Sequence, residues 1–133
     1  MQTVEYRTGR WKEPCVLLLG YFDGVHVGHR ALIAKAKKTA AEHGWTVGIM
    51  TFYDSKRGGQ IFLFDERVRI FESLGLDFVY AAPFNEAFRS TSWQDFWIKL
   101  YRTSVSALLR AAKILRSGKM RLAMFRSSVS IQI

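Results

Sequence analysis

The stretch from Leu17 to His29, Leu-Leu-Leu-Gly-Tyr-Phe-Asp-Gly-Val-His-Val-Gly-His, constrains the fold of this chain more than any other feature. Consecutive leucines are typical of a buried strand, and the glycines after them are typical of a tight loop. Beyond the loop, apolar residues recur with a 3.6-residue period, which predicts a helix from Gly28 to His43 that ends at Gly44. These apolar residues are Leu32, Ile33, Ala36 and Ala40. A strand, a glycine-bearing loop and a helix in this order form a phosphate-binding layout.

Two histidines, His26 and His29, flank Gly28 at the predicted helix start. A helix N-terminus presents unpaired N–H groups and a partial positive charge, and glycine lets an anion approach the backbone. An imidazole is a compact donor suited to phosphate oxygens whose charge grows when a phosphoanhydride is attacked. The stretch holds no obvious nucleophile, which favours phosphoryl or nucleotidyl transfer, in which the substrate supplies the attacking group. On the H-x-G-H pattern alone, two ordinary loop histidines are an equally good interpretation.

The segment from Gly20 to His29 resembles the G-N-F-D-G-V-H-x-G-H signature of the bacterial FAD synthetases. The resemblance implies a Rossmann-like nucleotidyltransferase fold of the α/β class, with a parallel sheet flanked by helices. It also implies FMN adenylyltransferase activity, in which AMP passes from ATP to FMN to give FAD and pyrophosphate, usually with Mg²⁺. ATP and FMN would then be the small-molecule partners. In the family, a riboflavin kinase domain normally follows.

The same resemblance assigns roles to the residues of the loop. It makes His26 and His29 the catalytic residues that hold the ATP phosphates. The nucleotide-binding set that it implies is Gly20, Phe22, Asp23, Gly24, His26, Gly28 and His29. Tyr21 stands where the family usually has asparagine. We expect no protein side chain to act as a metal ligand.

Length and composition narrow the class of protein. The 133 residues suit one domain that buries roughly two-thirds of the unfolded chain's surface. No run approaches the ~20 apolar residues of a membrane-spanning helix, and the N-terminus lacks the apolar core of a signal peptide. We therefore expect a cytoplasmic protein without a membrane partner. Cys15 is the single cysteine, which excludes a disulfide framework within the chain and a cysteine metal site.

The formal net charge of +9 suggests an anionic partner such as nucleic acid. The excess is uneven, because residues 103–133 hold six basic residues and no acidic one. The rest of the chain is only modestly basic, as suits an enzyme for nucleotides. A basic nucleic-acid-binding module is an alternative that depends on this tail, although Phe125 is the only aromatic residue interleaved with its charges.

The remainder of residues 1–102 predicts further strands and helices of the same sheet. Strands are predicted at Cys15–Leu19, Trp45–Phe52 and Phe78–Ala82, with a short edge strand considered over Thr3–Tyr6. Helices are predicted over Glu66–Leu74, with Asp65 as N-cap, and after Ser92. The second helix carries an aromatic stripe that we interpret as core rather than as a base-stacking surface: Trp93, Phe96, Trp97, Leu100 and Tyr101. Parallel strands place ligands beyond their carboxyl ends, where the loops 20–28 and 53–59 lie.

Basic residues near this predicted site have two interpretations. The family usually has T-F-x-P-H-P at the end of the second strand, but here Thr51-Phe52 is followed by Tyr53-Asp54-Ser55-Lys56-Arg57. Lys56 and Arg57 either contact substrate phosphates or belong to a solvated loop. The lysines of the first helix, Lys35, Lys37 and Lys38, predict a solvated face, with phosphate binding as the less favoured alternative.

The resemblance runs from about residue 15 to Arg102 and then stops. The family continues with a pattern of the type V-x-G-x-D-F-x-F-G, which contributes to its flavin site. Codons permitted for Thr103 to Phe125, read in a shifted frame, give Asp-Phe-Arg-Val-Ser-Ala-Leu-Ala-Cys-Gly-Lys-Asp-Phe-Thr-Phe-Gly and restore that motif. We therefore hypothesise that residues 1–102 are the N-terminal part of an adenylyltransferase domain, that the frame shifts after residue 102, and that residues 103–133 are out-of-frame. The sheet would then be cut off after three strands and expose its edge. The alternative is a native basic helix over Ser104–Leu115.

Three other functions compete with FMN adenylyl transfer. The chain is either an active enzyme or an inactive nucleotide-binding remnant of the family. Another nucleotidyltransferase of the same superfamily, of the cytidylyl or pantetheine type, is the nearest rival. The basic nucleic-acid-binding module is the alternative from a different class. The sequence leaves the oligomeric state open.

Overall fold

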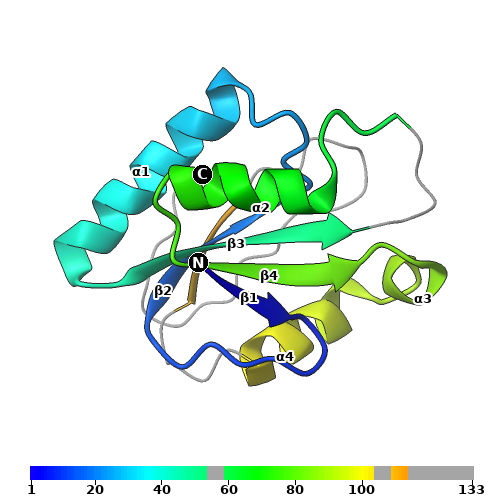
Figure 1. The fold of residues 1–133 in the computed structure, drawn as a ribbon. Coiled ribbons are helices and arrows are strands. Elements are labelled where there is room, and N and C mark those ends of the chain that lie inside the picture. The colour runs from blue at the N-terminus through cyan, green and yellow to red at the C-terminus, as the bar shows by residue number, and fades with distance from the viewer. Residues whose placement is uncertain (54–58, 104–108, 114–133) are drawn as a thin grey trace.

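The structure, a computed structural model, describes residues 1–53, 59–103 and 109–113. These residues form one parallel sheet with helices on both faces (Figure 1). The strands are β1 (Gln2–Glu5), β2 (Cys15–Leu19), β3 (Thr46–Tyr53), β4 (Phe78–Pro83) and β5 (Leu109–Lys113), and the helices are α1 (Val27–His43), α2 (Phe64–Ser73), α3 (Glu86–Arg89) and α4 (Trp93–Thr103). The strand order is β1-β4-β3-β2-β5, and every neighbouring pair is parallel. The predicted α/β class is confirmed.

Strand β2 lies inside the sheet and is buried along its whole length. It pairs with β3 on one side, where Leu17 lies opposite Gly48, and with β5 on the other. A parallel strand covered on both faces needs apolar side chains in both directions, which is why its sequence is an unbroken apolar run. The strand predicted from that run is confirmed at both ends.

Helices α1 and α2 cover one face of the sheet (Figure 1). Val16 and Leu18 of β2 contribute to the core on this side, as the two-residue period of a strand requires. The apolar stripe of α1 and the fully buried Phe71 of α2 pack against them. The buried members of this cluster are Val16, Leu18, Phe22, Val25, Ile33, Ala36, Ala40, Val47, Ile49, Phe71, Leu76 and Val79.

Helix α4 covers the opposite face, where Leu100 is fully buried and Phe96 packs against the core. The predicted core role of the aromatic stripe is therefore confirmed for these two residues, while the side chains of Trp93, Trp97 and Tyr101 lie outside the described part. The buried members of this second cluster are Val4, Tyr6, Cys15, Leu17, Leu19, Met50, Phe78, Tyr80, Ala82 and Leu100. Burial raises the pKa of the Cys15 thiol to about 12, which makes it an unreactive apolar side chain at ordinary pH.

The helix ends follow the sequence in two cases and differ in a third. Gly44 adopts a left-handed conformation with φ of 67° and ends α1, as predicted. The hydroxyl oxygen of Ser92 accepts a hydrogen bond from the Asp95 N–H at 3.1 Å, so its predicted capping role at α4 is confirmed. The prediction of Asp65 as N-cap is wrong, because α2 begins at Phe64 and Asp65 lies in its first turn. The Glu66 carboxylate instead accepts from the Leu63 N–H at 2.7 Å.

The sheet extends further than the three strands of the sequence prediction. The considered edge strand is present as β1, which pairs with β4. The far edge of β2 pairs with β5, so β2 is not an exposed edge. The alternative of a helix over Ser104–Leu115 is wrong for Leu109–Lys113, which is a strand; the other residues of that segment lie outside the described part. No helix in the described ranges is both long and apolar enough to cross a bilayer.

The contact between Gly48 and Phe78 is a testable packing constraint. These residues lie opposite each other in β3 and β4, and a Cβ at Gly48 would run into the Phe78 ring. We predict that Gly48→Ala lowers the free energy of unfolding by about 1–3 kcal/mol, measured by urea denaturation. The loss should be smaller when Phe78 is already leucine, because the ring is gone. An equal loss in both backgrounds would contradict this account.

Candidate functional site

The loop after β2 lies at the point where the sheet connections change direction. From β2 the chain proceeds to β3 on one side, whereas β5 lies on the other side. Ligands of open parallel sheets bind in the crevice beyond the carboxyl ends of the strands at such a switch point. The loop from Gly20 to His26 occupies this position between β2 and α1. The sequence prediction of the site's location therefore agrees with the topology.

This loop holds an unusual backbone conformation. Phe22, Gly24 and Val25 have φ values of 54°, 77° and 41°. Positive φ is uncommon outside glycine and is strained for a β-branched residue such as Val25. Phe22 and Val25 are 3% and 2% exposed and belong to the core beneath α1 and α2. Burial of these two side chains fixes the loop in a shape that an isolated peptide would not keep.

Glycine at two positions of the loop is explained by close neighbours. A Cβ at Gly20 would lie 2.9 Å from the Phe22 ring, and one at Gly28 would lie 3.2 Å from the His26 ring. Gly24 combines its positive φ with a close approach to Ile61. These glycines shape the loop.

His26 and His29 stand together at the start of α1. His26 is the N-cap residue, is exposed, and makes no side-chain capping bond. The two imidazole rings stack with centroids 3.6 Å apart and planes at 23°. The Phe22 ring packs against the His29 ring, with centroids 4.9 Å apart. The histidines that the sequence singled out are thus one cluster at the helix N-terminus.

The environment of His29 favours its neutral form. Burial is the larger cause that lowers the pKa of His29 below its usual 6.5, and the nearby His26 lowers it further. The buried Nδ1 atom of His29 has no hydrogen-bond partner among the described residues. A neutral imidazole keeps one N–H donor, so this ring can still donate a hydrogen bond to an anionic oxygen.

Asp23 fastens the loop to the segment that enters α2. Its carboxylate oxygens accept hydrogen bonds from the N–H of Ile61 at 3.0 and 3.1 Å and from the N–H of Phe62 at 3.1 Å. A carboxylate that accepts from backbone amides forms strong, charge-assisted bonds. Asp23 therefore ties the loop to the segment before α2, and its predicted place in a nucleotide site stays a prediction.

Arg67 is a component of this region that the sequence analysis did not single out. It is fully buried. Its Nη1 atom donates to the Tyr21 carbonyl and to the Thr51 hydroxyl, each at 2.7 Å, and its Nη2 atom donates to the Phe52 carbonyl at 2.6 Å. Burial lowers the pKa of Arg67, while Tyr21 and Asp23 oppose that shift. In the sequence, its spacing from Phe71 and Leu74 places it on the buried face of the helix, and this is the signal that could have predicted its burial.

The lysines of α1 lie on the exposed face, as predicted, and Lys37 donates from Nζ to the Leu74 carbonyl at 2.8 Å, at the end of α2. The alternative phosphate-binding role has no support in this contact. Lys56 and Arg57 lie outside the described residues, so both interpretations of them stay predictions. The residues that the structure describes contain no group of three potential metal ligands.

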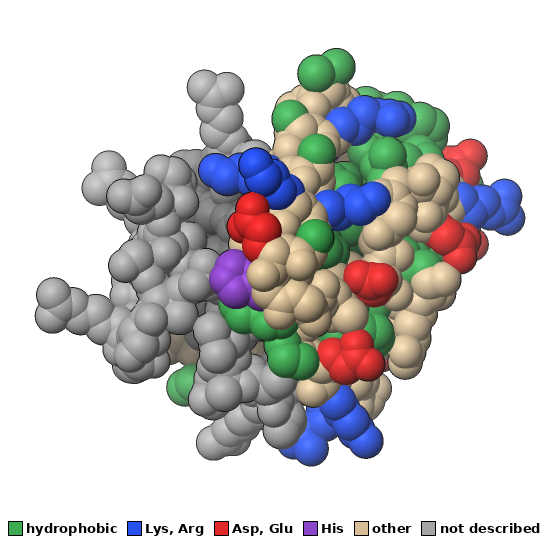
Figure 2. All heavy atoms as spheres, turned by 90° about the vertical axis from the view of Figure 1, so that its left-hand side faces the viewer, with side chains coloured by type: hydrophobic (Ala, Val, Ile, Leu, Met, Phe, Trp, Pro, Cys, Tyr) green, Lys and Arg blue, Asp and Glu red, His purple; other side chains and the backbone are tan. Residues whose placement is uncertain are grey.

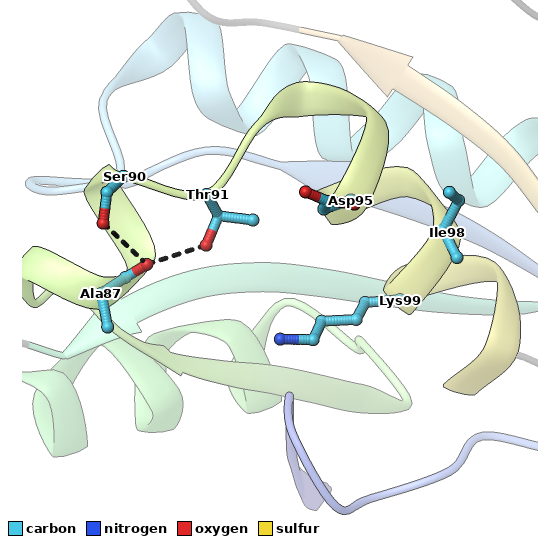
Figure 3. Close-up of a pocket in the computed structure, with 6 residues that line it drawn as sticks. All are labelled: Ala87, Ser90, Thr91, Asp95, Ile98 and Lys99. Atoms are coloured by element: carbon cyan, nitrogen blue, oxygen red, sulfur yellow. Dashed lines mark hydrogen bonds between the residues drawn. The ribbon is translucent and has the colours of Figure 1, made fainter.

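A separate hollow of about 340 Å³ lies between α3 and α4 (Figure 3). Its lining residues are Ala87, Ser90, Thr91, Asp95, Ile98 and Lys99. The hydroxyls of Ser90 and Thr91 turn to the Ala87 carbonyl of α3, at 3.4 and 2.8 Å. Because these polar groups bond within their own turn, the hollow presents no converging set of donors, unlike the histidine pair.

Comparison with known proteins agrees with this geometry. The family model described as FAD synthetase matches residues 9–114, which span the loop, both histidines and all strands from β2 to β5. The chain belongs to the FAD synthetase family. The match continues past Arg102 through β5, so the prediction that the resemblance stops at Arg102 is wrong.

Three relatives are named bifunctional riboflavin kinase/FMN adenylyltransferase. This chain is 38% identical to that of Bacillus subtilis over 90 residues, covering 61% of this chain and 28% of the relative. The Listeria monocytogenes protein is 31% identical over 90 residues, and the Escherichia coli K12 protein is 30% identical over 93 residues, covering 64% of this chain. The chain spans 28% to 30% of the length of these curated relatives.

A solved structure has the same fold over most of the chain. The crystal structure titled macrolide-efflux protein from Streptococcus pneumoniae superposes with a TM-score of 0.68 and 25% sequence identity. The match covers 84% of this chain and 46% of that one. The likeness supports the α/β fold and carries no efflux activity to this member of the FAD synthetase family.

The stacked histidines predict a measurable titration. Since the folded pKa of His29 is lowered, the folded state binds a proton less readily than the unfolded state. The free energy of unfolding should therefore fall as the pH drops through about 6.5 and below, and this fall should be smaller in His29→Gln. In His26→Gln, the pKa of His29 measured by NMR should rise yet stay below 6.5, because burial is the larger cause. A native His29 pKa above 6.5 would contradict the structure.

Proposed function

We propose that this chain carries the FMN adenylyltransferase function of its family, the transfer of AMP from ATP to FMN. The observation that carries the proposal is the His26–His29 pair stacked at the N-terminus of α1, at the switch point of the sheet. Family membership supports the choice of ATP and FMN as substrates.

The start of α1 supplies the donors for the triphosphate. The N–H groups of its first turn have no acceptor within the helix, and a helix of 17 residues places a partial positive charge there. The side chain of His26 lies against Gly28 in this turn, and the two imidazole rings stack there. Together the backbone N–H groups and the two rings form a set of hydrogen-bond donors that suits phosphate oxygens.

The reaction needs no nucleophile from the protein, because the FMN phosphate is the attacking group. An oxygen of the FMN phosphate attacks the α-phosphorus of ATP, a new P–O bond forms, and the bond to the bridging oxygen breaks so that pyrophosphate leaves. His26 and His29 would hold the phosphate oxygens and stabilise the charge that develops on them. Without a three-ligand cluster in the described ranges, Mg²⁺ would come bound to the triphosphate rather than to a protein cage.

Aromatic rings at the same edge of the sheet support a planar second substrate. Tyr21 lies with its ring centroid 6.2 Å from Phe52 and 6.4 Å from Phe84, three residues at or just past the carboxyl ends of β2, β3 and β4. Flat apolar side chains of this kind stack on planar ring systems such as the flavin of FMN.

Removal of the histidines tests the proposal directly. We predict that His26→Ala and His29→Ala each weaken ATP affinity by about tenfold or more, measured by calorimetry, because each removes a donor to a charged oxygen. His43→Ala is the matched control, since it makes the same change at the exposed C-terminal end of α1. Unchanged affinity in the double variant His26→Ala with His29→Ala would refute the proposal.

The same protein separates the competing functions. Incubation with ATP, Mg²⁺ and FMN should give FAD, whereas ATP binding without FAD would identify an inactive remnant. Turnover with other nucleotides and acceptors would identify a different nucleotidyltransferase.

On the face shown in Figure 2, Lys and Arg side chains alternate with Asp and Glu among the described atoms, so no single-sign patch supports a nucleic-acid interface there.

We also propose that the residues from 103 onward are read out of frame. The structure has β5 at positions 109–113, paired in parallel with the buried β2. The shifted reading places Leu-Ala-Cys-Gly-Lys there, in place of Leu-Arg-Ala-Ala-Lys. We predict that the coding DNA after the Arg102 codon encodes Asp-Phe-x-Phe-Gly in the shifted frame. An early stop codon in that frame would refute this.

A further inference from the structure

A buried guanidinium joins the two strand ends that border the candidate site. Arg67 reaches from α2 to the Tyr21 carbonyl, just past β2, and to the Phe52 carbonyl, near the end of β3. Thr51 completes the junction, because its hydroxyl donates to the same Tyr21 carbonyl at 2.6 Å. Residues far apart in the sequence are thus tied at the point where the loop leaves the sheet.

Aromatic rings hold the guanidinium in place. Its Cζ atom lies 4.8 Å from the centroid of the Tyr21 ring and 5.7 Å from that of Phe64. A planar cation stacks well on such faces. Tyr21, which departs from the asparagine of the family pattern, therefore contacts Arg67 through both its backbone and its ring.

The junction acts on the histidines through one residue. Tyr21 precedes Phe22, whose backbone takes a positive φ and whose ring contacts His29. Displacement of the Tyr21 carbonyl would move Phe22, and with it the support of the imidazole pair. Asp23, the residue after Phe22, accepts hydrogen bonds from the N–H groups of Ile61 and Phe62. The loop is therefore fastened on both sides of Phe22.

We propose that Arg67 is a positioning residue that sets the place of the histidine pair by holding the Tyr21 carbonyl against the end of β3. It does not contact the substrate. This inference rests on the proposed function for its consequence in ATP binding, whereas the placement of the rings is measurable without a nucleotide. Lysine cannot replace the fork, because one ammonium nitrogen does not reproduce the spacing of Nη1 and Nη2.

The test compares Arg67→Met, Arg67→Lys and Thr51→Val with the native chain. NMR signals of the His26 and His29 rings in nucleotide-free protein report their placement, and calorimetry reports ATP affinity. We expect Arg67→Met to shift both ring signals and to weaken ATP affinity about tenfold or more. Arg67→Lys should recover part of the affinity, and Thr51→Val should give a smaller loss with Arg67 intact.

Leu76→Ala is the control for lost stability alone. Leu76 is 4% exposed and belongs to the core cluster beneath α1 and α2. It lies past the C-terminal end of α2, away from the loop. It should lower the melting temperature and leave the ring signals and ATP affinity unchanged.

Three outcomes would overturn the role of Arg67: unchanged ring signals in folded Arg67→Met, full recovery by lysine, or an equal affinity loss in Leu76→Ala. If Arg67→Met does not fold, Arg67→Lys and Thr51→Val decide by the same signals. If native protein does not bind ATP, the proposed function fails, and the ring signals still test Arg67.

Discussion

The carbonyl of Tyr21 is the atom on which the rest of the candidate site depends. It accepts from Thr51 and from Arg67, and it marks the point where the chain leaves β2 and enters a loop with positive φ at Phe22 and Val25. A strained backbone persists only where surrounding contacts over-determine it. Two buried side chains and the hydrogen bonds at either side of Phe22 provide those contacts here.

The topology of the sheet determines where the loop after Tyr21 lies. β2 is buried on both faces and pairs with neighbours on both edges, and ligands of open parallel sheets bind beyond the carboxyl ends of the strands. Helix α1 starts there and brings its unpaired N–H groups and the two imidazoles to one place. The apolar run of β2 and the position of the histidine loop at the start of α1 are therefore two consequences of one topology.

Much of this arrangement was predictable from the sequence, since its signals are local. The apolar run of β2, the period of α1 and Gly44 at its end involve residues within a few positions of one another, and the structure agrees with all three. The histidine pair was predictable because His26 and His29 sit one helical turn apart. Asp65 was misplaced as a cap because aspartate is favoured both at the N-cap and in the first turn, and sequence alone does not separate the two.

The sequence by itself determined the fold class, the buried strand β2, the first helix and the place of the two histidines, because periodicity and glycine placement act over short distances. Only the tertiary structure decided the role of Arg67, whose partners Thr51 and Tyr21 lie 16 and 46 positions away. It likewise decided the burial that, together with the nearby His26, lowers the pKa of His29, and the hydrogen bonds of Asp23 with Ile61. Burial and hydrogen bonding between distant segments exist only once the sheet has brought them together, and no local pattern encodes them.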